Sequence, residues 1–318
     1  MEDEWTFVKK RTAAEGAVWV NQDRSRFKRT GDRQLESEAV FQERIAALGY
    51  PVPVVLESGS STGSDPEGFF FVEPSLGPAS LHDAAWNAVG GAYGPMPDAV
   101  VDAAAAVGVR LLKAQARHAE SATGDALNAW VQQAGWTVNV FAENPDLDTP
   151  RTRAVLETAL DRLAHTPLCW SHYDYGLPNA FPAGVIDWQH HGLAPVGYDT
   201  YPALEIIAFK GGTKGYYATP AQRARYTAAL DETALHVLGS KPGRHLGEFL
   251  LIKALFFLAL MKPADLTNTD KVLKWNYRRT LFTMGVEQYE RTGRIDTAAF
   301  PSLDDFAAQP EHCRTGGA

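Results

Sequence analysis

Residues 171–187 combine the side-chain types that phosphoryl transfer requires. The stretch from Ser171 to Asn179 reads Ser-His-Tyr-Asp-Tyr-Gly-Leu-Pro-Asn, and a short apolar run then ends at Asp187. A carboxylate at Asp174 can orient the attacking hydroxyl and accept its proton, while oxygen ligands from Asn179 and Asp187 can hold Mg²⁺ on the donor phosphates. The spacing predicts a loop and a following strand that bring these three side chains to one cleft. His172, counted with the catalytic residues, is expected to brace this loop through hydrogen bonds rather than to transfer protons.

The pattern His-x-Asp-x-x-x-x-Asn followed by Ile-Asp-Trp at 186–188 resembles the aminoglycoside phosphotransferase and choline kinase family, whose loop usually reads His-Gly-Asp-Leu-His-x-x-Asn. Asp199 matches the acidic residue of the family's next block in order and spacing. The resemblance implies transfer of the γ-phosphate of ATP or GTP, with Mg²⁺, to a hydroxyl of a small molecule. It gives Asp199 a structural role, in tying the catalytic loop or capping the next helix. Tyr173 and Tyr175 depart from the pattern, because they stand where the family has glycine and leucine.

An upstream segment extends the resemblance. Glu38-Ala39 followed by Gly-Tyr-Pro-Val-Pro at 49–53 is similar to the family's Glu-Ala helix and its Gly-x-Pro-x-Pro turn. The resemblance implies that Lys28 pairs with Glu38 and holds the α- and β-phosphates, since a cation on the leaving phosphates is best held in place by a carboxylate. The competing assignments are Lys10 for the cation and Glu36 or Glu43 for the acid.

Two further segments are expected to contact the nucleotide. Residues 69–77 resemble the hinge of the family, which implies that the Glu73 carbonyl and the Ser75 amide read the adenine edge. The loop that covers the phosphates should lie near residues 9–16, where Gly16 is the one glycine. The basic residues of this loop are either phosphate contacts or solvated side chains.

The elements that must position these residues change in type along the chain. Short apolar or alternating runs at 5–8, 17–21, 53–57 and 69–72 predict strands, and a helical period covers 35–48. Helices are predicted at 98–118 and 151–164, and the apolar run 249–261, which carries Lys253, predicts a buried helix. The predicted fold is therefore α+β and two-lobed like a protein kinase. A small β-rich N-terminal lobe with the hinge occupies residues 1–77, and a larger helical C-terminal lobe for catalysis and acceptor binding occupies 78–318.

Composition narrows the range of partners. The chain has 318 residues with a formal net charge of −8 and lacks a long basic stripe, which disfavours nucleic acid as a partner. An acidic surface suits a cationic acceptor, although it is also a common means of solubility. The two cysteines, an acidic start and the absence of a long apolar run predict a cytoplasmic protein that does not bind membranes.

Several alternatives share parts of this pattern. Choline, homoserine, methylthioribose and other metabolites are acceptors for the same scaffold, and a catalytically silent nucleotide-binding protein would keep the fold. A protein kinase would need a longer activation segment than residues 188–199 provide. Trp130, Trp136 and Phe141 lie close in sequence to three carboxylates, which suits either a cationic acceptor or ordinary packing; these are Glu143, Asp146 and Asp148.

Overall fold

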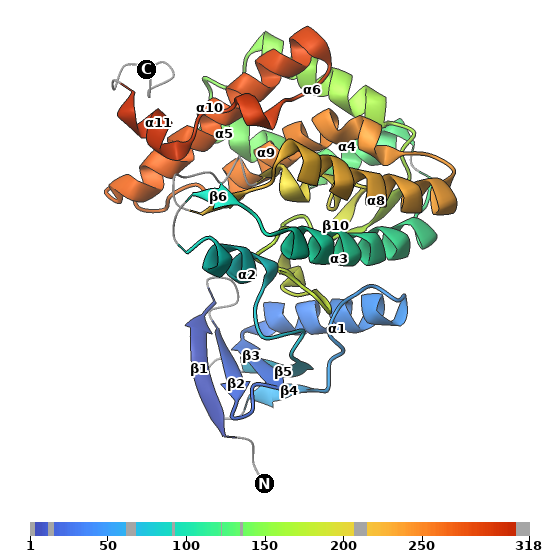
Figure 1. The fold of residues 1–318 in the computed structure, drawn as a ribbon, viewed down its shortest axis with the longest axis vertical. Coiled ribbons are helices and arrows are strands. Elements are labelled where there is room, and N and C mark those ends of the chain that lie inside the picture. Colours follow the sequence, from blue (N-terminus) through green and yellow to red (C-terminus); the bar gives the residue numbers. More distant parts are fainter. Residues whose placement is uncertain are drawn as a thin grey trace.

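The computed structural model describes residues 4–11, 16–61, 68–90, 93–121, 123–133, 136–206 and 215–309. A five-stranded sheet opens the chain, and most of the remaining elements are helices (Figure 1). Neighbouring strands of this sheet are antiparallel and follow the order β1-β2-β3-β5-β4. The strands are β1 (Trp5–Lys10), β2 (Ala17–Asn21), β3 (Arg26–Gly31), β4 (Glu57–Ser61) and β5 (Gly68–Pro74).

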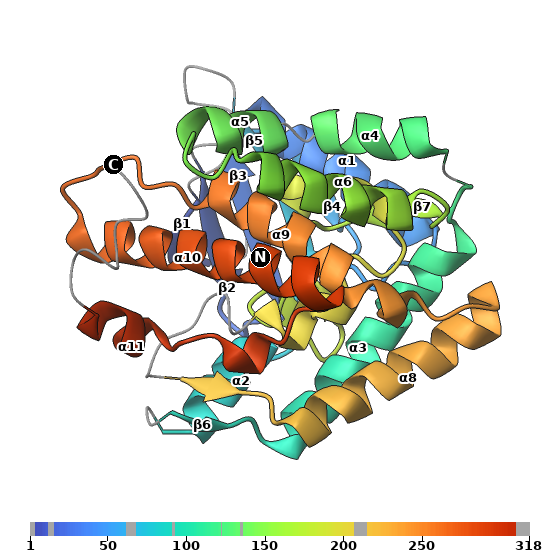
Figure 2. The same ribbon diagram turned by 90° about the horizontal axis from the view of Figure 1, so that it is seen from above.

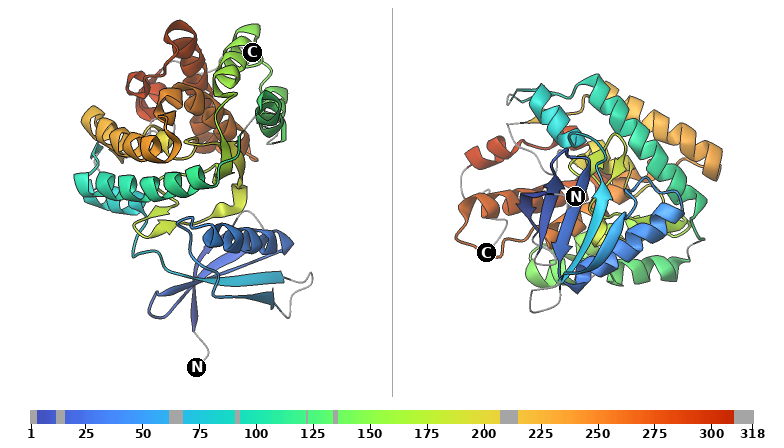
Figure 3. Two further views of the ribbon diagram at one scale, coloured as in Figure 1. Left: turned by 90° about the vertical axis from the view of Figure 1, so that its right-hand side faces the viewer. Right: turned by 90° about the horizontal axis from the view of Figure 1, so that it is seen from below.

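The helix α1 (Arg33–Ala47) lies on the face of the sheet that is turned toward the helical part of the molecule (Figure 3). Asp32 caps its start by accepting a hydrogen bond from the Gln34 amide. Its residues Leu35 and Ala39 pack with Phe71 of β5 in a small core of their own. The apolar positions of this helix thus divide between two contacts, since Phe41 and Ile45 pack into the main core instead.

The helical part is organised around α9 (Leu246–Leu260), which is buried along most of its length. The apolar run at 249–261 correctly predicted this buried helix. Seen from above, α10 runs beside α9, and α3 and α8 run side by side along another edge (Figure 2). The other helices of the described residues are α2 (Leu81–Ala88), α3 (Asp98–Arg117), α4 (Gly124–Gln133), α5 (Trp136–Glu143), α6 (Pro150–Leu163), α8 (Pro220–Leu238), α10 (Thr269–Thr292) and α11 (Leu303–Ala308).

Short strands between α6 and α8 carry the predicted catalytic segment. β7 (Leu168–Ser171) pairs with β10 (Gly192–Pro195), and β8 (Ala180–Phe181) pairs with β9 (Gly184–Val185). The β8–β9 hairpin contacts the small lobe directly, because the Val185 amide donates to the Pro51 carbonyl at 2.7 Å. A Cβ atom at Gly184 would lie 2.3 Å from that same carbonyl oxygen, so this close approach requires glycine.

Two short strands and four 3₁₀ helices complete the described elements. β6 (Gly94–Pro95) pairs in parallel with β11 (Tyr216–Tyr217), and the 3₁₀ helices are η2 (Trp188–His190), η3 (Tyr201–Leu204), η4 (Pro242–His245) and η5 (Thr297–Ala299). The small sheet-bearing lobe and the larger helical lobe confirm the predicted α+β class. The boundary between residues 77 and 78 stays a prediction. Among the helices of the described residues, none is long and apolar enough to cross a membrane.

Candidate active site

A buried aspartate, Asp199, fixes the backbone of the loop that follows β7. The carboxylate of Asp199 accepts hydrogen bonds from the backbone amides of His172 at 2.7 Å and Tyr173 at 3.1 Å. The ring of His172 is itself buried, and its Nε2 lies 2.8 Å from the carbonyl oxygen of Ile186. Asp199 therefore ties the loop, and His172 braces it against the strand that leads to Asp187. These are the supporting positions that the sequence predicts for both residues.

A buried lysine adds a second support beneath the loop. The Nζ atom of Lys253, on α9, donates to the Tyr173 carbonyl at 2.9 Å and lies 3.8 Å from Oδ1 of Asp199. Gln115 of α3 donates to the other carboxylate oxygen at 2.8 Å. A buried charge is stable only where polar partners compensate for its lost hydration. Lys253 and Gln115 are such partners for the Asp199 carboxylate, and the Tyr173 carbonyl is one for the Lys253 ammonium.

Tyr173 occupies a backbone conformation that usually belongs to glycine. Its φ is +66°, in the left-handed region, which explains why the family prefers glycine at this position. The side chain compensates by packing inside the large lobe, where its hydroxyl accepts from Trp130 Nε1 at 2.8 Å and donates to the Leu193 carbonyl at 2.7 Å. Gly192 makes room for this hydroxyl, because a Cβ atom at that position would lie 2.3 Å from it. Tyr173 is therefore a packing residue of this loop.

The three residues with the predicted chemical roles lie on adjoining parts of one loop and hairpin. The amide nitrogen of Asn179 donates to the Asp174 carbonyl at 3.0 Å and lies 3.4 Å from Oδ2 of the same residue. The backbone amide of Ile186 donates to the Asn179 carbonyl at 3.0 Å, which brings the following residue, Asp187, beside the loop. Asp187 has φ 70° and ψ 56°, a left-handed turn that redirects the chain after β9.

The donor set at Asn179 and Asp187 fits a hard divalent cation. Oδ1 of Asp187 is buried and accepts no hydrogen bond from the described residues. Both hydrogen bonds of the Asn179 side chain use its nitrogen, which leaves the amide oxygen as the atom suited to a metal. Carboxylate and amide oxygens are the ligands that Mg²⁺ takes in proteins.

Arg29 of β3 is one of two arginines that lie close to Glu38. Its Nε donates to Oε1 of Glu73 at 2.7 Å, and its Nη1 lies 3.7 Å from both Oε1 of Glu38 and Oδ1 of Asp187. Burial lowers the pKa of Arg29, but the carboxylates of Glu73, Glu38 and Asp187 outweigh it and raise the pKa above its usual value. One guanidinium group therefore joins two buried carboxylates of the small lobe to the partly buried carboxylate of Asp187 in the large lobe.

The predicted pairing of Lys28 with Glu38 is wrong. The Lys28 ammonium lies 4.3 Å from the centre of the Phe70 ring and 5.9 Å from that of Trp5, on the other face of the sheet. Successive side chains of a strand point to opposite faces, so a shift of one residue moves the cation from one face to the other. Arg29 follows Lys28 in β3 and occupies the position that the resemblance implied for Lys28.

A second arginine reaches the same carboxylates from the end of β1. Nη2 of Arg11 donates to Oε2 of Glu38 at 2.6 Å, lies 3.3 Å from Oε1 of Gln189 and lies 3.6 Å from Oδ1 of Asp187. Burial raises the pKa of Asp187, but Arg29 and Arg11 overcome this effect, so the net pKa lies below its ordinary value. Asp187 is therefore held in the ionised form that metal binding requires.

The segments expected to contact the nucleotide differ from the predictions in detail. The Ser75 amide donates to the Ser25 carbonyl at 2.8 Å, so this N–H is engaged within the small lobe and does not point to an adenine edge. Glu73 was expected to act through its backbone alone, yet its side chain also binds Arg29 and accepts from Gln42 at 2.9 Å. Gly16 packs closely against β3, since a Cβ atom there would lie 1.7 Å from the Thr30 carbonyl oxygen. This close contact explains why the position is a glycine. Most of the predicted phosphate loop, residues 12–15, lies outside the described residues.

Three charged groups of this site were missed or left open by the sequence. Lys253 carried a signal, since a lone lysine within an apolar helix must find a buried partner. Arg11 was one of several basic residues near the phosphate loop, and Arg29 was adjacent to the lysine that was chosen. Neither arginine could be singled out without the register of the sheet.

The carboxylates near Trp130 are engaged in ion pairs rather than gathered into an acceptor site. Asp146 pairs with Arg279 at 2.5 Å, Asp148 with Arg153 at 2.5 Å, and Glu143 with Lys262 at 3.2 Å. Trp130 and Phe141 are buried in the main core. Ordinary packing, the second of the two interpretations, therefore accounts for the described members of this cluster. The side chain of Trp136 lies outside the described residues.

The sequence and the fold both have recognisable relatives. Residues 7–238 match the family described as the phosphotransferase enzyme family. No curated protein sequence matches the chain significantly. Among solved structures, a Ralstonia eutropha protein assigned to the aminoglycoside phosphotransferases is 12% identical, with a TM-score of 0.60 and coverage of 92% of this chain and 94% of that one.

A second structural neighbour is the aminoglycoside phosphotransferase APH(4)-Ia. It is 13% identical, with a TM-score of 0.54 and coverage of 89% of this chain and 93% of that one. A thermostable mutant of that protein has been solved in a ternary complex with AMP-PNP and hygromycin B, and it matches with a TM-score of 0.52 at 13% identity. At such low identities these likenesses establish a shared fold, the two-lobed kinase-like fold of these phosphotransferases.

Proposed function

The chain belongs to the phosphotransferase enzyme family, and we propose that it transfers the γ-phosphate of ATP or GTP to a hydroxyl group of a small molecule. The observation that carries this proposal is the meeting of Asp174, Asn179 and Asp187 on one loop and hairpin, opposite the Arg29–Glu38 pair. A base, a pair of oxygen ligands and a fixed cation are the parts that phosphoryl transfer needs. An antibiotic of the aminoglycoside type and a metabolite with a free hydroxyl are both acceptors of the kind that such an enzyme would use.

Asp174 acts on the acceptor in this mechanism. Its carboxylate orients the acceptor hydroxyl toward the γ-phosphorus and takes up the hydroxyl proton as the new O–P bond forms. The bond between the γ-phosphorus and the oxygen that bridges it to the β-phosphate breaks, and the nucleoside diphosphate leaves. Positioning of the two reactants is the larger contribution, because a phosphoryl group needs little covalent help from the protein.

The remaining groups act on the donor. In this mechanism Arg29 binds the phosphates that become the leaving group, and its contacts with Glu38 and Glu73 support that role by holding the guanidinium in position. Asn179 and Asp187 would hold Mg²⁺, which when bound neutralises negative charge on the phosphates. Asp199 and Lys253 do not contact the substrates; they keep the loop in the conformation that presents Asp174.

A transfer assay with a matched pair of variants tests the proposal. The wild type, Asp174→Asn and Asp161→Asn are incubated with γ-labelled ATP or GTP, Mg²⁺ and a panel of hydroxylated acceptors. Asp161 is an exposed residue of α6 and serves as the control. We expect the Asp174 variant to lose at least about a hundredfold in rate, as removal of a general base usually does, and the Asp161 variant to match the wild type. If the wild type binds neither nucleotide with Mg²⁺, or if Asp174→Asn transfers phosphate as fast as the wild type, the proposal is wrong.

A further inference from the structure

A cavity of about 550 Å³ lies beside the catalytic loop, within the large lobe. Gly176, Leu177 and Pro178, which lie between Asp174 and Asn179 in the chain, form part of its wall. The first turn of α2 is attached to this wall, since the amide of His82 donates to the Leu177 carbonyl at 3.1 Å. A molecule bound in this cavity would therefore sit against the segment that carries the proposed base.

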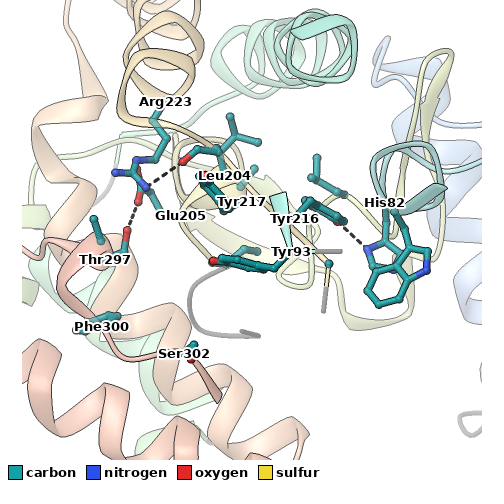
Figure 4. Close-up of a pocket in the computed structure, with 18 of the residues that line it drawn as sticks. His82, Tyr93, Leu204, Glu205, Tyr216, Tyr217, Arg223, Thr297, Phe300 and Ser302 are labelled. Carbon is teal, nitrogen blue, oxygen red and sulfur yellow. Dashed lines mark hydrogen bonds and ion pairs between the residues drawn. The ribbon is translucent and has the colours of Figure 1, made fainter. Parts of the chain in front are cut away.

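The cavity is bordered largely by aromatic rings. They come from α2, from the β6–β11 region, from α10 and from the segment before α11, and are Trp86, Tyr93, Tyr216, Tyr217, Tyr277 and Phe300. Four of them are labelled in Figure 4, namely Tyr93, Tyr216, Tyr217 and Phe300. The rings of Tyr93 and Tyr217 lie 5.0 Å apart. The Tyr216 hydroxyl is 2.7 Å from Nδ1 of His82. Trp86 and Tyr93 remain 39% and 52% exposed, so both offer ring surface to a ligand.

The ionised groups of the wall are already engaged. Its carboxylates among the described residues are Glu205 and Asp305. Glu205 pairs with Nε of Arg223 at 3.1 Å and accepts a hydrogen bond from Thr297 (Figure 4). Asp305 is exposed and accepts a hydrogen bond from the Ser302 hydroxyl at 2.6 Å as part of a helix cap.

This distribution of charge disfavours a polycation. A ligand with several ammonium groups binds well only where several carboxylates face it, because each buried ammonium must be paired. Among the described residues of the wall, the more buried carboxylate is that of Glu205, which is matched by the Arg223 guanidinium; burial raises the pKa of Glu205 although Thr297 and Arg223 act in the opposite direction. Flat rings with polar hydroxyls suit a different ligand, one that stacks a ring and hydrogen-bonds through its own hydroxyls.

We propose that this cavity binds the acceptor and that the acceptor is an uncharged hydroxylated molecule with a flat ring, of the aryl glycoside class, rather than a polyamine. The proposal rests on the phosphotransferase function proposed above. One hydroxyl of the glycoside reaches past Gly176–Pro178 to Asp174, gives its proton to that carboxylate and forms a bond to the γ-phosphorus. The bond from that phosphorus to the β-phosphate oxygen breaks, and the products are a phosphorylated glycoside and a nucleoside diphosphate.

Binding without turnover tests the acceptor class directly. The full-length Asp174→Asn protein is titrated calorimetrically in the absence of nucleotide with 4-nitrophenyl β-D-glucopyranoside and, separately, with kanamycin. We expect the neutral glucoside to bind at least about ten times more tightly than kanamycin, because it stacks without leaving unpaired ammonium groups. A second titration at raised salt concentration shows whether ion pairing contributes, and we expect the glucoside affinity to be unchanged.

Ring variants identify the site. In the same Asp174→Asn protein, Trp86→Ala and Tyr217→Ala should each weaken glucoside binding roughly tenfold, whereas Trp86→Phe should keep most of it. Phe7→Ala is the matched control, since Phe7 is an exposed aromatic residue of β1, outside the cavity. Tighter binding of kanamycin with a strong salt dependence, no binding of the glucoside, or glucoside binding that ignores both ring variants would each overturn the proposal.

A parallel titration separates this proposal from the one on which it rests. Binding of a fluorescent ATP analogue with Mg²⁺ is measured on the same wild-type and Asp174→Asn samples. If the nucleotide binds and the glucoside does not, only the acceptor class is wrong. If the nucleotide also fails to bind, the phosphotransferase function is wrong as well.

Discussion

Exchange of the two adjacent cations of β3 discriminates between their roles. Arg29 and Lys28 differ by one position, yet Arg29 contacts Glu73, Glu38 and Asp187 while Lys28 lies over aromatic rings on the other face of the sheet. We predict that Arg29→Lys weakens nucleotide binding at least about tenfold. This loss corresponds to one bidentate contact of the guanidinium, worth about 1.4 kcal/mol or more. We expect Lys28→Met to change the nucleotide affinity less than about twofold, because Lys28 lies on the other face of the sheet.

The effect on stability follows from the same contacts. Arg29→Met would leave the buried Glu73 without its cation, with Arg11 remaining only beside Glu38 and Asp187, and breaking a buried ion pair costs about 3–5 kcal/mol. Arg29→Lys keeps the charge but cannot reach all three acids from one ammonium, so we expect a loss of about 1.5–3 kcal/mol, the value of one hydrogen bond to a charged group. Lys28→Met removes cation–π contacts worth about 0.5–1 kcal/mol.

The assay uses two readouts on each purified variant. Urea unfolding gives the change in the free energy of unfolding, and titration with a fluorescent ATP analogue and Mg²⁺ gives the nucleotide affinity. Arg29→Lys is the decisive variant, because it keeps the positive charge and loses less stability than Arg29→Met. The reasoning is refuted if Lys28→Met loses nucleotide affinity while Arg29→Lys retains that of the wild type.

Three further predictions concern the supports of the loop and its surroundings. Tyr173→Phe removes a hydroxyl that bonds Trp130 and Leu193, so calorimetric unfolding should show a loss of about 1–3 kcal/mol, and an unchanged stability would contradict the role of these bonds. Lys253→Met leaves the buried Asp199 without its cation and should cost about 3–5 kcal/mol in urea unfolding. The control Lys274→Met breaks an exposed ion pair of α10 and should cost less than about 1 kcal/mol. Equal losses in the two variants would argue against the support of the loop by Lys253. Burial lowers the pKa of His191, so the unfolded state binds a proton first as the pH falls, and stability is lost below about pH 6.5. His191→Gln should therefore reduce the slope of the unfolding free energy against pH between about pH 7 and 5. An identical slope in the variant and the wild type would refute this prediction.

Strand limits and hydrogen-bond partners were less predictable than the order of the elements. The apolar run at 53–57 predicted a strand, yet the strand β4 is Glu57–Ser61, which consists largely of serine and glycine. Its pairing with β5, from Glu57 opposite Val72 to Ser61 opposite Gly68, decides its place in the sheet. Backbone hydrogen bonds to a neighbouring strand can thus override the side-chain pattern on which a sequence-based prediction depends.

The sequence alone predicted which residues of the loop lie together and that α9 is buried. Asp174, Asn179 and Asp187 are close along the chain, so a local loop and hairpin suffices to bring them together, and a continuous apolar run must be buried wherever it lies. Only the tertiary structure decided that the cation of β3 near Glu38 is Arg29 and not Lys28, and that Arg11 joins it, because a strand alternates its faces and the register of β3 places Arg29 on the face of the carboxylates. The same holds for Lys253 and Asp199, which are distant in sequence and depend on the packing of α9 beneath the loop.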